Sequence, residues 1–154
     1  MVRGERGFTL IELMIVVVII GVLVSIGLPQ YNNMTSQARV AAVKNNMHTL
    51  QIAVEDFASR SNGVYPPNAA TLTVDGALTL QQLLPSAAMP TNPFTAGPTT
   101  LDWSNALGTP PATDPAGGVS LNVIQSIPGA AWDTYEIRGA DGANALLSTI
   151  LSNT

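Results

Sequence analysis

The feature that most constrains this chain is an apolar run near its start, from Phe8 to Leu28, in which Glu12 is the one charged residue. A helix rises 1.5 Å per residue, so a helix over this run is about 31 Å long, the thickness of a bilayer's hydrocarbon core. The run is rich in Ile and Val, but it is too long for one strand. It therefore predicts a single membrane-spanning helix.

The next stretch, Gln30–Ser59, contains neither Gly nor Pro and predicts an amphipathic helix. Its apolar residues recur at spacings of three and four, which places them on one face. This apolar stripe consists of Val40, Val43, Met47, Leu50, Val54 and Phe57. We expect the two helical stretches to form one long helix that is kinked near Pro29, because proline removes a backbone hydrogen bond.

The remaining residues, 61–154, are rich in turn-forming Gly and Pro and predict a small sheet. Alternating apolar residues predict strands over Val119–Val123, Trp132–Arg138 and Ala145–Leu151. Leucines before Pro85 predict a short helix, and the Pro- and Thr-rich stretch Pro90–Gly118 predicts a long loop. The sheet needs an apolar partner, and the stripe on the long helix is the large apolar surface available.

The predicted fold class is therefore α+β, with a long N-terminal α-helix whose C-terminal half packs on a small antiparallel β-sheet. Four segments follow from the composition: a short charged segment, 1–7; the apolar helix, 8–29; its amphipathic continuation, 30–60; and a globular head, 61–154, that contains loop 90–118 and the strands.

Composition excludes several classes of function. Six Lys and Arg against ten Asp and Glu give a net charge of −4, which argues against nucleic-acid binding. The chain contains no Cys, which excludes disulfides, thiol nucleophiles and zinc–thiolate sites, and His48 is its one histidine. The neighbouring Glu55 and Asp56 point about 100° apart on a helix and do not form a facing acid–base pair. We therefore expect neither an enzyme nor, in the first instance, a cofactor.

An apolar segment that follows basic residues can also be a secretory signal or a plain membrane anchor. A secretory signal ends in a small-residue cleavage site, whereas this run is followed by Pro29 and further helix, and the small residue Gly7 precedes it. A plain anchor, such as that of a single-span sensor, does not explain a carboxylate at Glu12, which costs a few kcal/mol in hydrocarbon.

The residues Gly7-Phe8-Thr9-Leu10-Ile11-Glu12 resemble the prepilin signature of type IV pilins and of the pseudopilins of type II secretion. The resemblance implies that a prepilin peptidase removes the leader, residues 1–7, by cutting between Gly7 and Phe8, and that the new amino group of Phe8 is N-methylated. It also implies that Glu12 pairs with the terminal amine of a neighbouring subunit.

The same resemblance implies that Thr9 and Pro29 belong with Glu12 to the assembly residues. It further implies a helical homopolymer whose other partners are the prepilin peptidase and the proteins of an inner-membrane assembly platform. Arg3 and Arg6 place the leader in the cytoplasm by the positive-inside rule. The precursor is then a single-pass protein of the inner membrane, and the mature subunit lies in an extracellular pilus or a periplasmic pseudopilus.

Two filaments remain open: a type IV pilus, used for adhesion, twitching motility or DNA uptake, and the pseudopilus of a type II secretion system. The length of Pro90–Gly118 favours the pilus. Many pilins hold the C-terminal segment with a disulfide, so this cysteine-free chain must use packing or a metal. Weak candidates for calcium ligands are Asp133, Asp141 and Asn144, although an Asp-Gly pair is first of all a turn.

Overall fold

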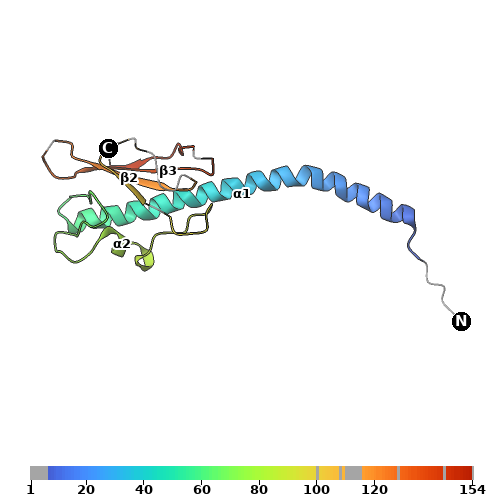
Figure 1. The fold of residues 1–154 in the computed structure, drawn as a ribbon, viewed down its shortest axis with the longest axis horizontal. Helices are drawn as coiled ribbons and strands as arrows, with labels where there is room; N and C mark the ends of the chain where they lie inside the picture. Colours follow the sequence, from blue (N-terminus) through green and yellow to red (C-terminus); the bar gives the residue numbers. More distant parts are fainter. Residues whose placement is uncertain are drawn as a thin grey trace. The chain divides into compact units, whose positions relative to one another are not determined.

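A computed structural model of the chain describes residues 7–99, 101–107, 109, 116–127, 129–143 and 145–153. The longest element is helix α1, Leu10–Arg60, with 51 residues (Figure 1). The chain divides into two units, of which the first ends at Gln37 and the second begins at Ala38.

The first unit consists mainly of the N-terminal part of α1, and the side chains from Leu10 to Met34 are all exposed. Within the described residues, α1 is the one helix long and apolar enough to cross a membrane. The helix continues through Pro29, which has no N–H to donate to the carbonyl of Ser25. The kink that the sequence predicts at Pro29 stays a prediction.

The second unit contains the C-terminal part of α1, which buries one face. The apolar stripe predicted from the sequence is confirmed for five of its six members, since Val40 is only half-buried. Three further residues on this face, two small and one polar, are buried although the spacing of large apolar residues does not predict them. The buried residues of α1 are Val43, Asn46, Met47, Leu50, Ala53, Val54, Phe57 and Ala58.

A sheet of four strands in the order β1-β2-β3-β4 packs on this face and lies along the C-terminal part of α1 (Figure 1). The strands are β1, Leu101–Ser104; β2, Val119–Ile124; β3, Thr134–Gly139; and β4, Leu151–Ser152. The apolar residues of β2 and β3 alternate toward the helix, as period-two patterning requires. Those that are fully buried are Val119, Leu121, Val123, Tyr135 and Ile137.

The sheet corrects two predictions. First, it is mixed, because β1 pairs with β2 in parallel, whereas an antiparallel sheet was expected. Strand β1 lies inside the predicted loop Pro90–Gly118, and its four residues are too short an apolar pattern to predict a strand in so proline-rich a stretch. Second, the strand predicted over Ala145–Leu151 is mostly absent, apart from a bridge at Leu146 and the two residues of β4.

The turn that precedes Ala145 explains the missing strand. The carboxylate of Asp141 accepts hydrogen bonds from the backbone N–H groups of Ala143 (2.8 Å) and Ala145 (2.9 Å). These donors are therefore not available to a neighbouring strand, and the chain turns here before it returns along β3.

Two short helices connect α1 to the sheet. Helix α2, Leu80–Leu83, begins at Thr79, whose N–H donates to Oε1 of Gln82 at 2.8 Å. A 3₁₀ turn, η1, covers Pro85–Ala87. The short helix predicted before Pro85 is confirmed.

The first part of the predicted loop is ordered around one buried amide. Asn92 is fully buried, donates to the carbonyl of Ala116 (2.9 Å) and accepts from the N–H of Phe94 (2.8 Å). On α1, Asn46 donates to the carbonyl of Thr91 at 2.9 Å. The guanidinium of Arg39 lies 5.8 Å from the ring centroid of Phe94. Both contacts fasten this loop to the helix.

Candidate assembly site

The candidate site lies where α1 begins. Residues 7–9 are not helical, and the helix starts at Leu10. The Oε2 atom of Glu12 accepts hydrogen bonds from the Thr9 N–H (2.9 Å) and from the Thr9 hydroxyl (2.7 Å). The Glu12 N–H in turn points at the Thr9 hydroxyl oxygen, 3.3 Å away. This reciprocal arrangement is a capping box, in which Thr9 is the N-cap and Glu12 is the third helical residue.

The capping box is not among the features predicted above, although its signal is present in the sequence. Thr9-Leu10-Ile11-Glu12 has the spacing of a Thr followed three residues later by a Glu in front of an apolar run, which is the signature of such a cap. The resemblance to prepilins implies only a partner for Glu12 on a neighbouring subunit. The structure gives Glu12 a partner within its own chain.

The cap bears directly on the electrostatics of the site. A carboxylate at the N-terminus of a helix is stabilised by the unpaired N–H groups and by the helix dipole. Both hydrogen bonds from Thr9 go to Oε2, and within the described residues no donor is bound to Oε1. Glu12 can therefore keep its cap and still accept a hydrogen bond from an ammonium group of another molecule.

The other predicted site residues fall into two groups. Gly7 and Phe8 directly precede the cap, and both are exposed, with Phe8 at 77%. The leader residues before Gly7 lie outside the described residues. Pro29 lies 17 positions beyond Glu12, or about 26 Å along a helix, so the structure does not bring it to the cap.

The helix surface next to the cap is apolar and hollowed. One shallow hollow of about 370 Å³ is lined by Ile11, Met14, Ile15, Val18 and Ile19. Another lies further along the helix, beside Leu23, Gly27 and Tyr31. Hollows of this kind accept the side chains of a second helix, which is how helices pack.

The calcium candidates occupy separate turns at opposite ends of β3. Asp133 accepts hydrogen bonds from the N–H (2.8 Å) and the hydroxyl (2.9 Å) of Ser126, and these bonds lower the pKa of the Asp133 carboxyl. Asp141 caps its own turn, as described above, and Asn144 lies outside the described residues. In the described part of the chain, no three His, Asp or Glu side chains gather to hold a metal ion.

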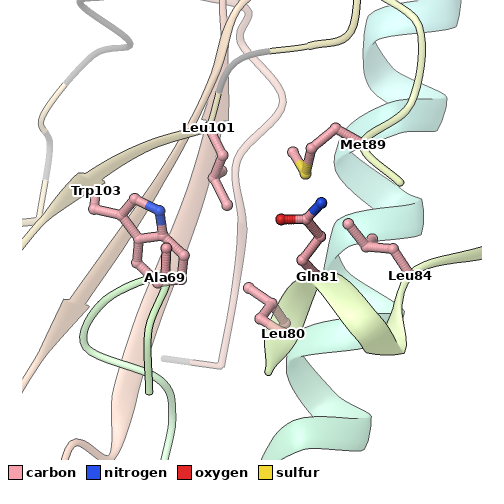
Figure 2. Close-up of a pocket in the computed structure, with 7 residues that line it drawn as sticks. All are labelled: Ala69, Leu80, Gln81, Leu84, Met89, Leu101 and Trp103. Carbon is pink, nitrogen blue, oxygen red and sulfur yellow. The ribbon is translucent and has the colours of Figure 1, made fainter. Parts of the chain in front are cut away.

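The head contains a cavity of about 190 Å³ between α2 and β1 (Figure 2). Its lining is mostly apolar and consists of Ala69, Leu80, Gln81, Leu84, Met89, Leu101 and Trp103. None of these side chains is an acid, a base or a nucleophile near neutral pH. Elsewhere, His48 is exposed and contacts Gln51.

Comparisons with known proteins match the region that carries the cap. The family model described as the prokaryotic N-terminal methylation motif matches residues 2–28. A fimbrial protein of Pseudomonas aeruginosa is 45% identical over 53 residues, which are 34% of each chain. The type IV major fimbrial protein FimA of Dichelobacter nodosus is 47% identical over 51 residues, 33% of each chain.

A second kind of relative matches the same end of the chain. The type II secretion system core protein G of Pseudomonas aeruginosa is 39% identical over 64 residues, which are 42% of this chain and 44% of that protein. No solved structure matches. The chain thus spans about a third of the length of the fimbrial relatives and less than half of protein G. The N-terminal region of this chain is therefore similar to that of type IV fimbrial proteins and of a type II secretion core protein.

Proposed function

We propose that this chain is the subunit of a type IV pilus that polymerises through its apolar N-terminal helix. The observation that carries the proposal is the start of α1, where the capped Glu12 carboxylate, whose Oε1 binds no donor among the described residues, lies beside an exposed apolar surface. The fimbrial relatives match this same region.

Assembly follows from the chemistry of these residues. Cleavage between Gly7 and Phe8 creates a new amino group, which is then methylated and remains a cation. In a bundle of such helices, the amino group of one subunit pairs with Glu12 of its neighbour. A charge in an apolar bundle is satisfied only by a correctly placed partner, so the pair fixes the register between subunits.

Before cleavage, the precursor resides in the inner membrane with its leader in the cytoplasm, because Arg3 and Arg6 precede the span. The prepilin peptidase and the proteins of the assembly platform act on it there. The head then lies on the opposite side of the membrane, and the mature subunit passes into an extracellular filament that serves adhesion, twitching motility or DNA uptake.

The alternative is the major pseudopilin of a type II secretion system, which forms a periplasmic filament. The similarity to protein G favours this alternative, since it extends over 64 residues. Filaments sheared from the surface of wild-type cells should contain this chain if it is a pilin. Surface filaments that lack the chain, together with a secretion defect in a deletion strain, would favour the pseudopilin.

Glu12→Gln tests the assembly mechanism. The amide oxygen can still accept the hydrogen bonds from Thr9, so this change removes the charge and leaves an acceptor for the cap. We expect the variant to remain in the membrane and to form no filaments, as measured by immunoblots of sheared fractions. The matched control is Asp56→Asn, the same kind of change on the same helix, at a carboxylate that pairs with Arg60. Normal filaments in Glu12→Gln would contradict the pairing.

We further propose that the head folds without bound calcium. Asp133 and Asp141 already accept hydrogen bonds from their own turns, which supports a structural role for both carboxylates. The melting temperature of the purified chain should therefore be the same with EGTA and with millimolar calcium. A fall of several degrees with EGTA would show that calcium contributes to stability.

A further inference from the structure

The C-terminal segment, residues 145–153, runs back along the edge of β3, and we call it the strap. Few backbone contacts hold it. The N–H of Leu147 donates to the carbonyl of Gly139 at 2.9 Å, and the two residues of β4 pair with Glu136 and Ile137. Such a short ladder is weak, because strands are usually five or six residues long.

Asn153 adds three side-chain contacts at the end of the strap. Its Oδ1 accepts a hydrogen bond from the N–H of Tyr135 at 2.9 Å, and its Nδ2 donates to the carbonyl of Asp133 at 2.9 Å and to the hydroxyl of Tyr65 at 3.3 Å. One side chain thus joins the strap to the start of β3 and to the segment that follows α1.

The network continues from the two tyrosines to α1. The Tyr135 hydroxyl donates to Oε1 of Glu55 at 2.6 Å, and the Tyr65 hydroxyl donates to Oε2 of the same residue at 3.3 Å. The Nε2 of Gln51 donates to the Tyr135 hydroxyl at 3.3 Å. A carboxylate acceptor makes these bonds stronger than bonds between neutral groups.

Burial fixes the geometry of this network. Tyr135 is fully buried, Tyr65 is 8% exposed, and their ring centroids lie 4.8 Å apart. Burial and the nearby Glu55 carboxylate both raise the pKa of each tyrosine, so the hydroxyls remain donors throughout the physiological range. The two buried tyrosines therefore connect the strap to α1 in a fixed geometry.

We propose that Asn153 is the latch of the strap, and that Glu55 is the point on α1 at which the latch is fastened through Tyr65 and Tyr135. The latch keeps the strap on β3, a task that a disulfide could otherwise perform but that a chain without cysteine cannot give to one. When the strap opens, the N–H and C=O groups along the edge of β3 become available to another extended segment. While Asn153 holds the strap in place, the strap covers the edge of β3 and prevents it from pairing with a strand of another head.

Amide hydrogen exchange of the full chain in detergent tests this proposal. Asn153→Ala should accelerate exchange about tenfold in peptides that cover the strap and β3, because the lost hydrogen bonds set the free energy of local opening. Exchange in the buried part of α1 and in β2 should stay as in the wild type. Asn45→Ala, which changes an exposed asparagine on α1, is the matched control and should leave the strap unchanged.

Tyr65→Phe provides a second, gentler test, because it removes the hydroxyl and keeps the ring. It should accelerate exchange in the strap by a smaller factor than Asn153→Ala. Wild-type exchange of the strap in both variants would overturn the proposal. Equal acceleration across the whole head, or failure of both variants to fold, would also overturn it, because Asn153 would then support the fold as a whole and not a local latch.

Discussion

At the scale of single residues, the capping box changes how the start of α1 is understood. The charge of Glu12 looked misplaced in an apolar run, but Thr9 binds its carboxylate within the same chain. Such a carboxylate has two roles that can be separated: one oxygen caps the start of the helix, and the other can bind a neighbouring amine. Spacing alone predicts the first role, whereas the second depends on a molecule outside the chain.

The cap can be weakened without touching the charge. Thr9→Ala removes the hydroxyl, and we expect the amide protons of the first helical turn to exchange about fivefold faster, since losing an N-cap costs a factor of this order. Thr9→Ser keeps the hydroxyl and should exchange like the wild type. Nuclear magnetic resonance of the full chain in micelles measures this directly. Equal exchange rates in the wild type and both variants would show that the cap does not stabilise the first turn of α1.

A second prediction at this scale concerns Gly117. Its φ is +77°, and a Cβ atom there would lie 2.5 Å from Oδ1 of Asn92 and 2.7 Å from the Phe94 ring. Gly117→Ala should therefore lower the free energy of unfolding by about 2 kcal/mol, from backbone strain and overpacking together. Gly97→Ala is the control, because its Cβ would meet nothing closer than 3.9 Å. Similar thermal unfolding curves for the two variants would contradict this account of the loop.

At the scale of elements, the sequence predicts those helices and strands whose apolar residues recur with a regular period. The stripe on α1 and the alternation in β2 and β3 follow from periods of 3.6 and two residues. Strand β1 could not be predicted, because its four residues gain their structure from parallel pairing with β2 across an intervening segment. The shortness of β4 could not be predicted either, since it depends on how the Asp141 carboxylate uses nearby backbone donors.

The stabilisation that Asp133 gives to the connection between β2 and β3 should be lost in acid. Hydrogen bonds from Ser126 lower the pKa of Asp133 in the folded chain, so the carboxylate stabilises the fold above its unfolded pKa, about 4. This contribution is lost as the pH falls through the lower folded value. Asp133→Asn should melt at a lower temperature than the wild type at pH 7, and the difference should shrink toward pH 2. Parallel melting curves across this range would contradict the role of Asp133.

At the scale of the whole molecule, the chain combines two kinds of surface. The N-terminal part of α1 exposes a long apolar run in the single chain, whereas the head buries its own core. An apolar surface of this size needs a membrane or copies of itself.

The candidate site was predictable because it lies within one short contiguous motif. The latch was not, because it joins residues such as Glu55 and Asn153, which are far apart in the sequence.

The most direct test of the central claim is the mass of the chain recovered from sheared filaments of wild-type cells. We predict a chain that begins at Phe8 and carries one methyl group on its terminal amine. Tandem mass spectrometry of the N-terminal peptide identifies both features in one measurement. A chain that still begins at Met1, in cells with an active prepilin peptidase, would contradict the assignment as a processed filament subunit.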